Sequence, residues 1–161
     1  MIIREATTND IDGIWKIFEA VIKTGDTFAF APDTPKAEMQ KLWFPPGAKT
    51  FVAEDDGKIA GSYFIKPNQP GLGSHIANCG YMVDPKERGK GIAGQMCAHS
   101  IQVAKELGYK ALQYNLVVST NVKAVKLWER SGFKIIGTIP GGFHHNTLGY
   151  VDAYIMFREV H

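Results

Sequence analysis

A glycine-rich stretch, Arg88–Gly94, carries the strongest chemical signal in the sequence, and it reads Arg-Gly-Lys-Gly-Ile-Ala-Gly. It follows a predicted strand and opens a predicted helix. The N–H groups that begin a helix have no partner within it, and they lie at the positive end of the helix dipole. Small residues let an anion approach this backbone closely, and Lys86, Arg88 and Lys90 add positive charge. The stretch therefore predicts a phosphate-binding turn.

Two common nucleotide-binding motifs do not fit this turn. Gly89, Gly91 and Gly94 match the dinucleotide pattern Gly-x-Gly-x-x-Gly, which is weak evidence alone. That fold needs a βαβ unit and an acidic residue about 20 positions further on. Here the turn follows a predicted hairpin, and no Asp or Glu occurs from Leu107 through Trp128. A nucleotide-triphosphatase loop is excluded as well, because the sequence has no Gly-Lys-Ser/Thr at this place.

Hydrophobic periodicity predicts one α+β domain over residues 1–161, with a mixed, mostly antiparallel central sheet of about seven strands flanked by four helices. The order rules out a doubly wound parallel fold, because three strands follow one another between the second and third helices. The segment 141–149 is rich in glycine and predicts a mobile loop. Strands are expected at 2–5, 50–54, 58–66, 76–83, 111–118, 133–139 and 150–157, and helices near 11–22, after Pro35, at 92–107 and at 121–130.

Two sequence blocks resemble the GNAT (Gcn5-related N-acetyltransferase) superfamily. The first is Arg88-x-x-Gly91-x-Ala93, which has the form of the family's loop for the pyrophosphate of coenzyme A. The second is Asn121-x-x-Ala124-x-x-Leu127-Trp128, followed by Ser-Gly-Phe. Their spacing and the element order also fit, so the resemblance covers nearly the whole chain. It implies acetyl-CoA as the acyl donor and direct attack by an amine, without an acyl-enzyme.

The resemblance also implies where acetyl-CoA binds. The strand Cys79–Val83 would splay from its parallel neighbour Gln113–Val117, and the pantetheine arm would occupy the opened edge like an extra strand. Backbone groups near Met82–Asp84 would hold the arm, and one N–H there would polarise the thioester carbonyl. The cofactor-binding residues implied are Met82, Val83, Asp84, Arg88, Gly89, Lys90, Gly91, Ile92, Ala93, Gly94, Asn121, Leu127 and Trp128.

The sequence departs from the family pattern at Trp128, where many relatives have a tyrosine that protonates the departing thiolate. Indole can donate a hydrogen bond but cannot transfer a proton at neutral pH. A thiol pKa near 8.5 makes the thiolate a fair leaving group without an acid. We therefore expect positioning and oxyanion stabilisation to carry the rate. Packing of Trp128 in the core is an equally good interpretation.

No catalytic residue is assigned from the sequence. An attacking ammonium must lose a proton to a base or to a water relay. Glu54, His75, Asp26 and Asp152 are candidates, and each is better explained as a surface or hydrogen-bonding group.

Two asparagines mark the expected substrate end. Asn78 and Asn115 lie in predicted strands, where asparagine is disfavoured, so each suggests a specific hydrogen bond; an amide satisfied by nearby backbone is the alternative. The runs 114–121 and 139–153 resemble fungal N-acetyltransferases of proline analogues such as azetidine-2-carboxylate, whose matching asparagines grip the substrate's amine and carboxylate. The segment 24–28 resembles the loop that closes over substrate in phosphinothricin-type acetyltransferases, which implies substrate contact by Phe28.

Composition narrows the function further. The formal net charge of +2 is too small for a nucleic-acid-coating protein, and no apolar stretch is long enough for a membrane span. Two cysteines cannot make a disulfide framework, so we expect a cytoplasmic protein. The adjacent His144 and His145 are poorly spaced for one metal ion, and no metal is expected.

Three functions remain open at this point, and the first of them is the one that we expect. The first is acetyl transfer to a small-molecule amine, such as an amino acid or an analogue. The second is acetyl transfer to a peptide amine, and the third is a CoA-binding regulatory module without turnover. A homodimer is implied only by the family resemblance.

Overall fold

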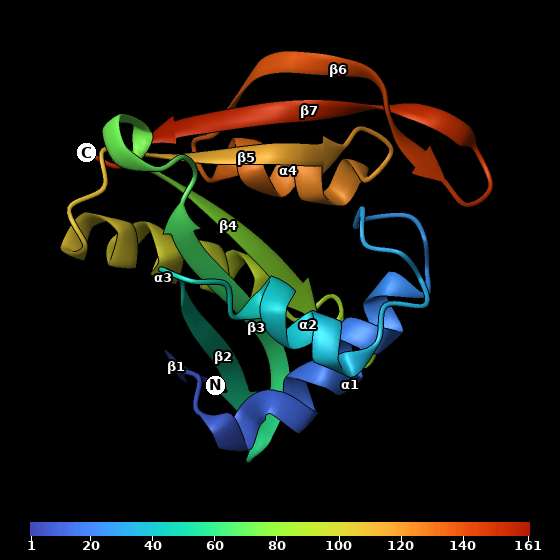
Figure 1. Cartoon of the computed structure of the whole chain (residues 1–161), viewed down its shortest axis with the longest axis vertical. Coiled ribbons are helices and arrows are strands. Elements are labelled where there is room, and N and C mark those ends of the chain that lie inside the picture. Colours follow the sequence, from blue (N-terminus) through green and yellow to red (C-terminus); the bar gives the residue numbers. More distant parts are fainter.

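Seven strands form one mixed sheet in the order β1-β2-β3-β4-β5-β7-β6 in the computed structural model, which describes residues 1–161 (Figure 1). Every neighbouring pair is antiparallel except β4 and β5. This confirms the predicted fold class. The strands are β1 (Ile2–Glu5), β2 (Lys49–Asp55), β3 (Lys58–Pro67), β4 (Ile76–Val83), β5 (Ala111–Val118), β6 (Lys134–His145) and β7 (Gly149–Glu159). The helices are α1 (Ile11–Ile22), α2 (Lys36–Trp43), α3 (Ile92–Glu106) and α4 (Val122–Arg130), with short 3-10 turns η1 (Thr8–Asp10), η2 (Gly71–Gly73) and η3 (Pro85–Glu87).

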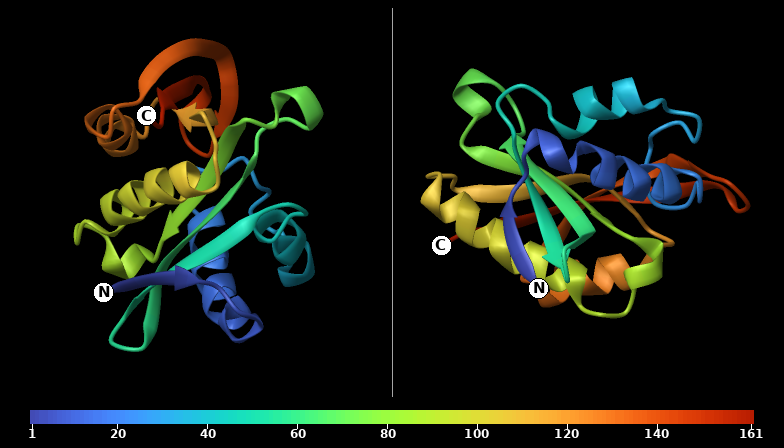
Figure 2. Two further views of the ribbon diagram at one scale, coloured as in Figure 1. Left: turned by 90° about the vertical axis from the view of Figure 1, so that its left-hand side faces the viewer. Right: turned by 90° about the horizontal axis from the view of Figure 1, so that it is seen from below.

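The helices cover both faces of the sheet, with α1 and α2 on one side and α3 and α4 on the other (Figure 2). Side chains of a strand alternate between faces, which divides β3 between two apolar cores. Tyr63 and Ile65 pack with α3 residues, whereas Phe64 packs with Phe18 of α1 and Trp43 of α2. Because both faces are buried, β3 is nearly continuously apolar in sequence. None of the helices is long and apolar enough to cross a membrane.

The prediction of a mobile loop over residues 141–149 is wrong. Strand β6 continues to His145, and only a short turn at residues 146–148 separates it from β7. Pairing resumes at Phe143 after an irregularity that begins at Ile139. Phe143 is buried, and the backbone N–H of Gly141 donates to the Asp152 carboxylate at 3.0 Å. These contacts hold a glycine-rich segment in the sheet against its intrinsic flexibility.

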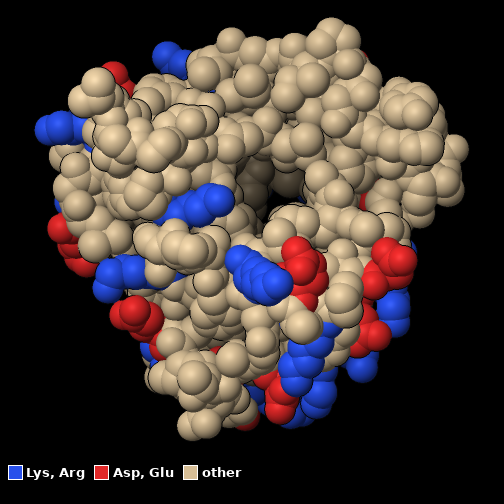
Figure 3. Space-filling view, viewed as in Figure 1, with Lys and Arg blue, Asp and Glu red and all other residues tan.

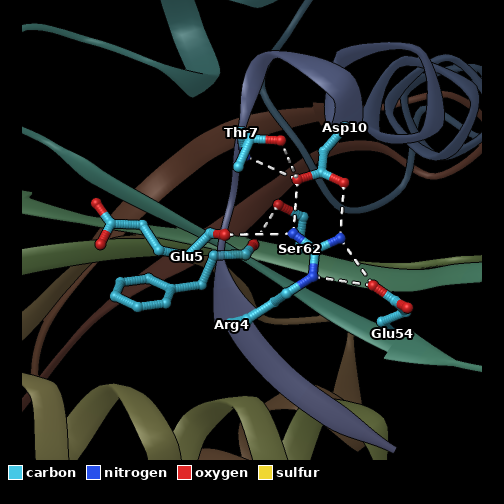
Figure 4. A network of polar contacts seen from close by, with 7 residues as sticks. Arg4, Glu5, Thr7, Asp10, Glu54 and Ser62 are labelled. Carbon is cyan, nitrogen blue, oxygen red and sulfur yellow. Dashed lines mark hydrogen bonds and ion pairs between the residues drawn. The ribbon is translucent and has the colours of Figure 1, made fainter. Parts of the chain in front are cut away.

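A polar network around Arg4 fixes the N-terminal edge of the sheet (Figure 4). The Arg4 guanidinium donates to both carboxylate oxygens of Asp10, at 2.8 and 2.9 Å, and to Glu54 on β2 at 2.7 and 2.9 Å. Asp10 also accepts the backbone N–H of Thr7 at 2.7 Å, completing the capping box at the start of η1. The Asp10 side chain is only 7% exposed. One arginine thus joins β1, β2 and the entry to α1.

We predict that Asp10→Asn lowers the free energy of unfolding by about 1 kcal/mol at neutral pH, allowing for solvent screening at the partly exposed Arg4. Hydrogen bonds from Arg4 hold the pKa of Asp10 below its ordinary 3.8. The carboxylate therefore contributes stability above that value, which is lost as the pH falls through the lowered pKa.

Urea unfolding from about pH 5 down to about pH 2 measures this effect. The difference in the free energy of unfolding between wild type and variant should become smaller as the pH falls. The control is Asp12→Asn, whose carboxylate is mostly exposed and should leave stability near that of wild type. An equal gap at both ends of the range contradicts the prediction.

Candidate active site

The only parallel pair of strands separates almost at once. β4 and β5 are in register at Ile76–Ala111 and Ala77–Leu112, and they diverge beyond those pairs (Figure 1). At the point of divergence the side chain of Asn78 donates its Nδ2 to the carbonyl oxygen of Gln113 at 2.9 Å. A side-chain amide thus satisfies a carbonyl that a continuous ladder would pair with backbone. The result is a V-shaped opening in the centre of the sheet.

The backbone of β4 offers hydrogen-bonding groups to this opening. Along a strand the N–H and C=O groups alternate between its two edges. Asp84 donates its N–H to Ala60 in β3 at 2.8 Å, so the N–H of Met82 also faces β3, whereas those of Tyr81 and Val83 face the opening. The backbone groups that the family resemblance implies for the pantetheine arm lie near Met82–Asp84. Within that stretch only Val83 presents its backbone to the opening.

The turn before α3 has the geometry expected of an anion site. No backbone N–H from Gly89 through Gly94 donates to any group of the chain. Gly91 caps the helix with φ of +76°, and a Cβ built there would find its nearest neighbour, Gln95 Nε2, 4.0 Å away. Arg88 is exposed, while Lys90 forms an ion pair with Glu87. Unpaired donors, open space and a helix N-terminus together fit the phosphates of a nucleotide cofactor.

Helix α4 lies beside this turn and contributes Leu127 and Trp128. A Cβ on Gly94 would lie 3.6 Å from Leu127 Cδ1, which brings α4 against the start of α3. The Asn121 side chain precedes α4 without capping it. Trp128 is 8% exposed, and its indole N–H has no acceptor in the chain. Since no fully buried side-chain nitrogen lacks a partner, that N–H must reach solvent. Trp128 is thus both a packing residue and a free hydrogen-bond donor.

Sequence reasoning missed a pair of tyrosines that spans the opening. Tyr81 of β4 and Tyr114 of β5 meet through their hydroxyls at 2.7 Å, and Tyr81 OH lies 2.6 Å from Ser100 Oγ of α3. Both rings pack against Trp128 with centroids 5.0 Å apart. Burial raises the pKa of both phenols well above the ordinary value, so they stay protonated. The signal available in the sequence was the alternation of side chains along a strand, which assigns each tyrosine to one face of its predicted strand.

The two cysteines are buried and unreactive. Burial raises the pKa of the Cys79 thiol to about 12, and it also raises that of Cys97. A thiol needs its thiolate form to act as a nucleophile. The chain therefore presents no cysteine suited to an acyl-enzyme, which agrees with direct transfer.

Amide side chains gather on the α1 face of the sheet, opposite the tyrosine pair, at the point where β4 and β5 separate. Asn115 donates its Nδ2 to Asn68 Oδ1 at 2.7 Å, and it accepts from Gln113 Nε2 at 3.1 Å. With the bond from Asn78 to Gln113, these residues connect β4, β5 and the segment after β3. The structure thus brings both predicted asparagines together. Figure 3 shows a hollow on this face, between β4 and β5 as they lie in Figure 1.

The segment after α1 packs on the same face of the sheet, against α1 and α2. Phe28 stacks on Phe30 and meets Trp43 edge to face, so it lies on the same face as the asparagines, within an aromatic cluster. The β6–β7 turn contacts this segment, because Asn146 donates to the carbonyl oxygens of Thr24 at 2.5 Å and Gly25 at 3.0 Å. A Cβ on Gly25 would approach Asn146 Cβ to 2.9 Å, so the contact requires glycine. We call this contact the strap.

None of the four candidate bases is singled out by geometry. Glu54 belongs to the Arg4 network. Asp26 accepts from Thr24 Oγ1 at 2.5 Å, and Asp152 accepts from the backbone of Gly141. His75 is exposed beside the start of β4. No group of three or more His, Cys, Asp or Glu side chains gathers anywhere in the chain, His144 and His145 included.

Known proteins share both the sequence and the fold. The model of the Acetyltransferase (GNAT) family matches residues 16–133. N-acetyltransferase aca1 of Schizosaccharomyces pombe is 43% identical over 113 residues, which is 68% of this chain but only 54% of that protein's length. The L-amino acid N-acetyltransferase AaaT of Escherichia coli is 29% identical over 98% of this chain and 97% of its own.

A solved GCN5-related N-acetyltransferase from Kribbella flavida superposes with a TM-score of 0.94 at 39% identity, covering 98% of this chain and 96% of its own. The match extends over the strands that separate, the turn before α3 and the strap. The chain therefore belongs to the acetyltransferase (GNAT) family and is an acetyl-CoA-dependent N-acetyltransferase.

Proposed function

We propose that the enzyme acetylates the amine of a small molecule, an amino acid or an amino-acid analogue. The observation that carries this proposal is the cluster of amides where β4 and β5 separate, on the face that is hollowed in Figure 3 and on which the strap also lies. Amide groups can serve both the donors and the acceptors of a small zwitterion. The relative AaaT is named for L-amino acids, which favours the same class.

The cofactor residues inferred from the family fit acetyl-CoA, which supplies an acetyl thioester when bound. The unpaired N–H groups of Gly89–Gly94 would bind its diphosphate. The backbone of Tyr81 and Val83 would hold the pantetheine arm, and one of these N–H groups would face the thioester carbonyl. The Asn121 amide and the indole N–H of Trp128 are further donors at this side of the opening.

The amine would approach from the other face. Asn78 uses its Nδ2 on Gln113, so its Oδ1 is left to accept a hydrogen bond from the substrate's amine. None of the four candidate bases forms a hydrogen bond with the Asn78 side chain, and we therefore assign proton removal to water. The chain thus acts mainly by positioning the amine and by stabilising charge on the carbonyl oxygen.

Two competing functions are less well supported. A peptide substrate needs a continuous groove, and the strap crosses the region where a peptide would extend. A regulatory module without turnover needs no amine site, yet the amide cluster lies directly at the opening.

The remaining proposals concern the number of domains, the oligomeric state and the cellular compartment. One sheet includes strands from both ends of residues 1–161, which supports a single catalytic domain. Strand β6 is an edge strand with Ile135 and Ile136 exposed, which supports a homodimer through that edge. We also propose a cytoplasmic compartment, because the two buried thiols are free.

Thiol release from acetyl-CoA in the presence of an amine panel tests the function directly. The panel holds the L-amino acids, their analogues including azetidine-2-carboxylate, and peptides with free N-termini. We expect release with free amino acids or analogues, because the amide cluster fits them. Release only with peptides contradicts the small-molecule proposal. Tight CoA binding without release for any amine favours the regulatory module.

Gly91→Val tests the cofactor site. We expect CoA to bind at least about tenfold more weakly, since a branched side chain would fill the space in front of the unpaired N–H groups. The matched control is Gly108→Val at the other end of α3, where φ is +82° and no atom lies within 4 Å of an added Cβ. Both variants carry the same backbone strain, so calorimetry of unfolding should show similar losses. Equal CoA affinity in the two variants contradicts the assignment.

Trp128→Phe separates packing from proton donation. The phenyl ring keeps the contacts with Tyr81 and Tyr114 but removes the N–H. We expect kcat within about threefold of wild type, because general acid catalysis is typically worth about 100-fold or more. A fall of 100-fold with unchanged thermal stability would assign the donor a catalytic role.

A further inference from the structure

A lysine without an acidic partner lies next to the amide cluster. Lys66, near the end of β3, is in register with Asn78 on β4, so both side chains project from the same face of the sheet. Its Nζ lies 5.8 Å from the centroid of the Phe64 ring, on the α1 face. No carboxylate of the chain lies within 4.0 Å of this nitrogen.

Asn68 continues the row of side chains that Phe64 and Lys66 form on the α1 face. It follows β3 by one residue, and its N–H bonds to the carbonyl oxygen of Ile76 at 2.8 Å, which prolongs the pairing with β4. Phe64, Lys66 and Asn68 are spaced two apart, so they share one face. The contact of Asn68 with Asn115 at 2.7 Å brings this row to β5.

The internal hydrogen bonds leave one end of each amide free. Only an NH2 group can donate to the Gln113 carbonyl, so Asn78 turns its Oδ1 away from that contact. Asn68 accepts from Asn115 through Oδ1, which leaves its NH2 group without an acceptor in the chain. The cluster therefore offers a cation and an amide donor close to one free amide acceptor.

This arrangement matches an α-amino acid, in which a carboxylate and an amine are joined through one carbon. We propose that Lys66 and the NH2 group of Asn68 bind the substrate's carboxylate, while Asn78 Oδ1 accepts from its amine. The substrate class is then free amino acids, and compounds whose carboxylate is amidated are poor substrates. This inference rests on the proposed function and adds the group that selects the substrate's acid end.

The test compares the best L-amino acid acceptor of the panel with its own carboxamide, which keeps the amine and the side chain. The carboxamide has the lower amine pKa and so more neutral amine, so a preference for the free acid cannot reflect amine reactivity. Lys66→Met removes the cation and keeps much of the side chain's volume. Lys58→Met is the matched control, because Lys58 is an exposed lysine at the other end of β3.

We expect Lys66→Met to lose about 10- to 100-fold in kcat/KM for the free amino acid, as is typical for a hydrogen bond to a charged group. Activity on the carboxamide, the KM for acetyl-CoA and the melting temperature should change little. Lys66→Arg should restore most of the activity, and Lys58→Met should behave as wild type.

Two results overturn the inference alone. In one, wild type uses acid and carboxamide equally well; in the other, Lys66→Met lowers both activities equally, which indicates that Lys66 serves only to cover Phe64. A wild-type enzyme that releases thiol with peptides but with no amino acid overturns the proposed function itself. The two failures are therefore distinguishable in one set of assays.

Discussion

The need to pair buried backbone groups governs the centre of this molecule. A parallel ladder between β4 and β5 would satisfy both strands, yet it stops after two register pairs. The carbonyl of Gln113 is then left without a strand partner, and the Asn78 amide takes that place. On β4 the backbone groups of Tyr81 and Val83, which face the opening, have no partner on β5. Because an unpaired buried group is costly, such an edge persists only where another molecule or water completes it.

Side-chain packing maintains the separation on the α3 face. Tyr81, Tyr114 and Trp128 form a compact aromatic group between the diverging strands, and the two hydroxyls bond across the gap. Their bulk prevents the strands from closing, while the hydrogen bond prevents them from spreading further. The register of β5 against β7 also shifts between Tyr114 and Val117, which re-aims the side chains at the level of the opening. The side chains that hold the two strands apart therefore also border the opening where the reaction is proposed to occur.

Much of this arrangement could be predicted from the sequence, because strong local signals specify it. The two apolar runs that form β2 and β3, the Asp-Gly pair at residues 56–57 that turns between them, and the glycine-rich turn at 88–94 are strong local signals of this kind. The family blocks then indicated that β4 and β5 separate. Asn78 and Asn115 stood out because amides are unusual in strands, and the structure does give each a specific hydrogen bond.

What the sequence could not provide depends on contacts between distant segments. The extension of β6 to His145 depends on Asp152 and on burial of Phe143, which local glycine content does not reveal. The orientation of backbone groups along β4 depends on its register with β3. Lys66 looks like any surface lysine until that same register places it beside Asn78. The Tyr81–Tyr114 pair required knowledge of which strand faces would meet.

The strap has a consequence for the order of events at the site. The two halves of the sheet pair at Ile76–Ala111 and Ala77–Leu112, and a second contact joins the β6–β7 turn to the segment after α1, where Asn146 meets Thr24 and Gly25. An opening bounded at both ends is a window through the sheet rather than an open jaw. In the proposed arrangement the acyl donor is bound on one side of this opening and the acceptor on the other. In this arrangement the donor and the acceptor can be bound at the same time. Neither has to leave before the other binds, so either can bind first.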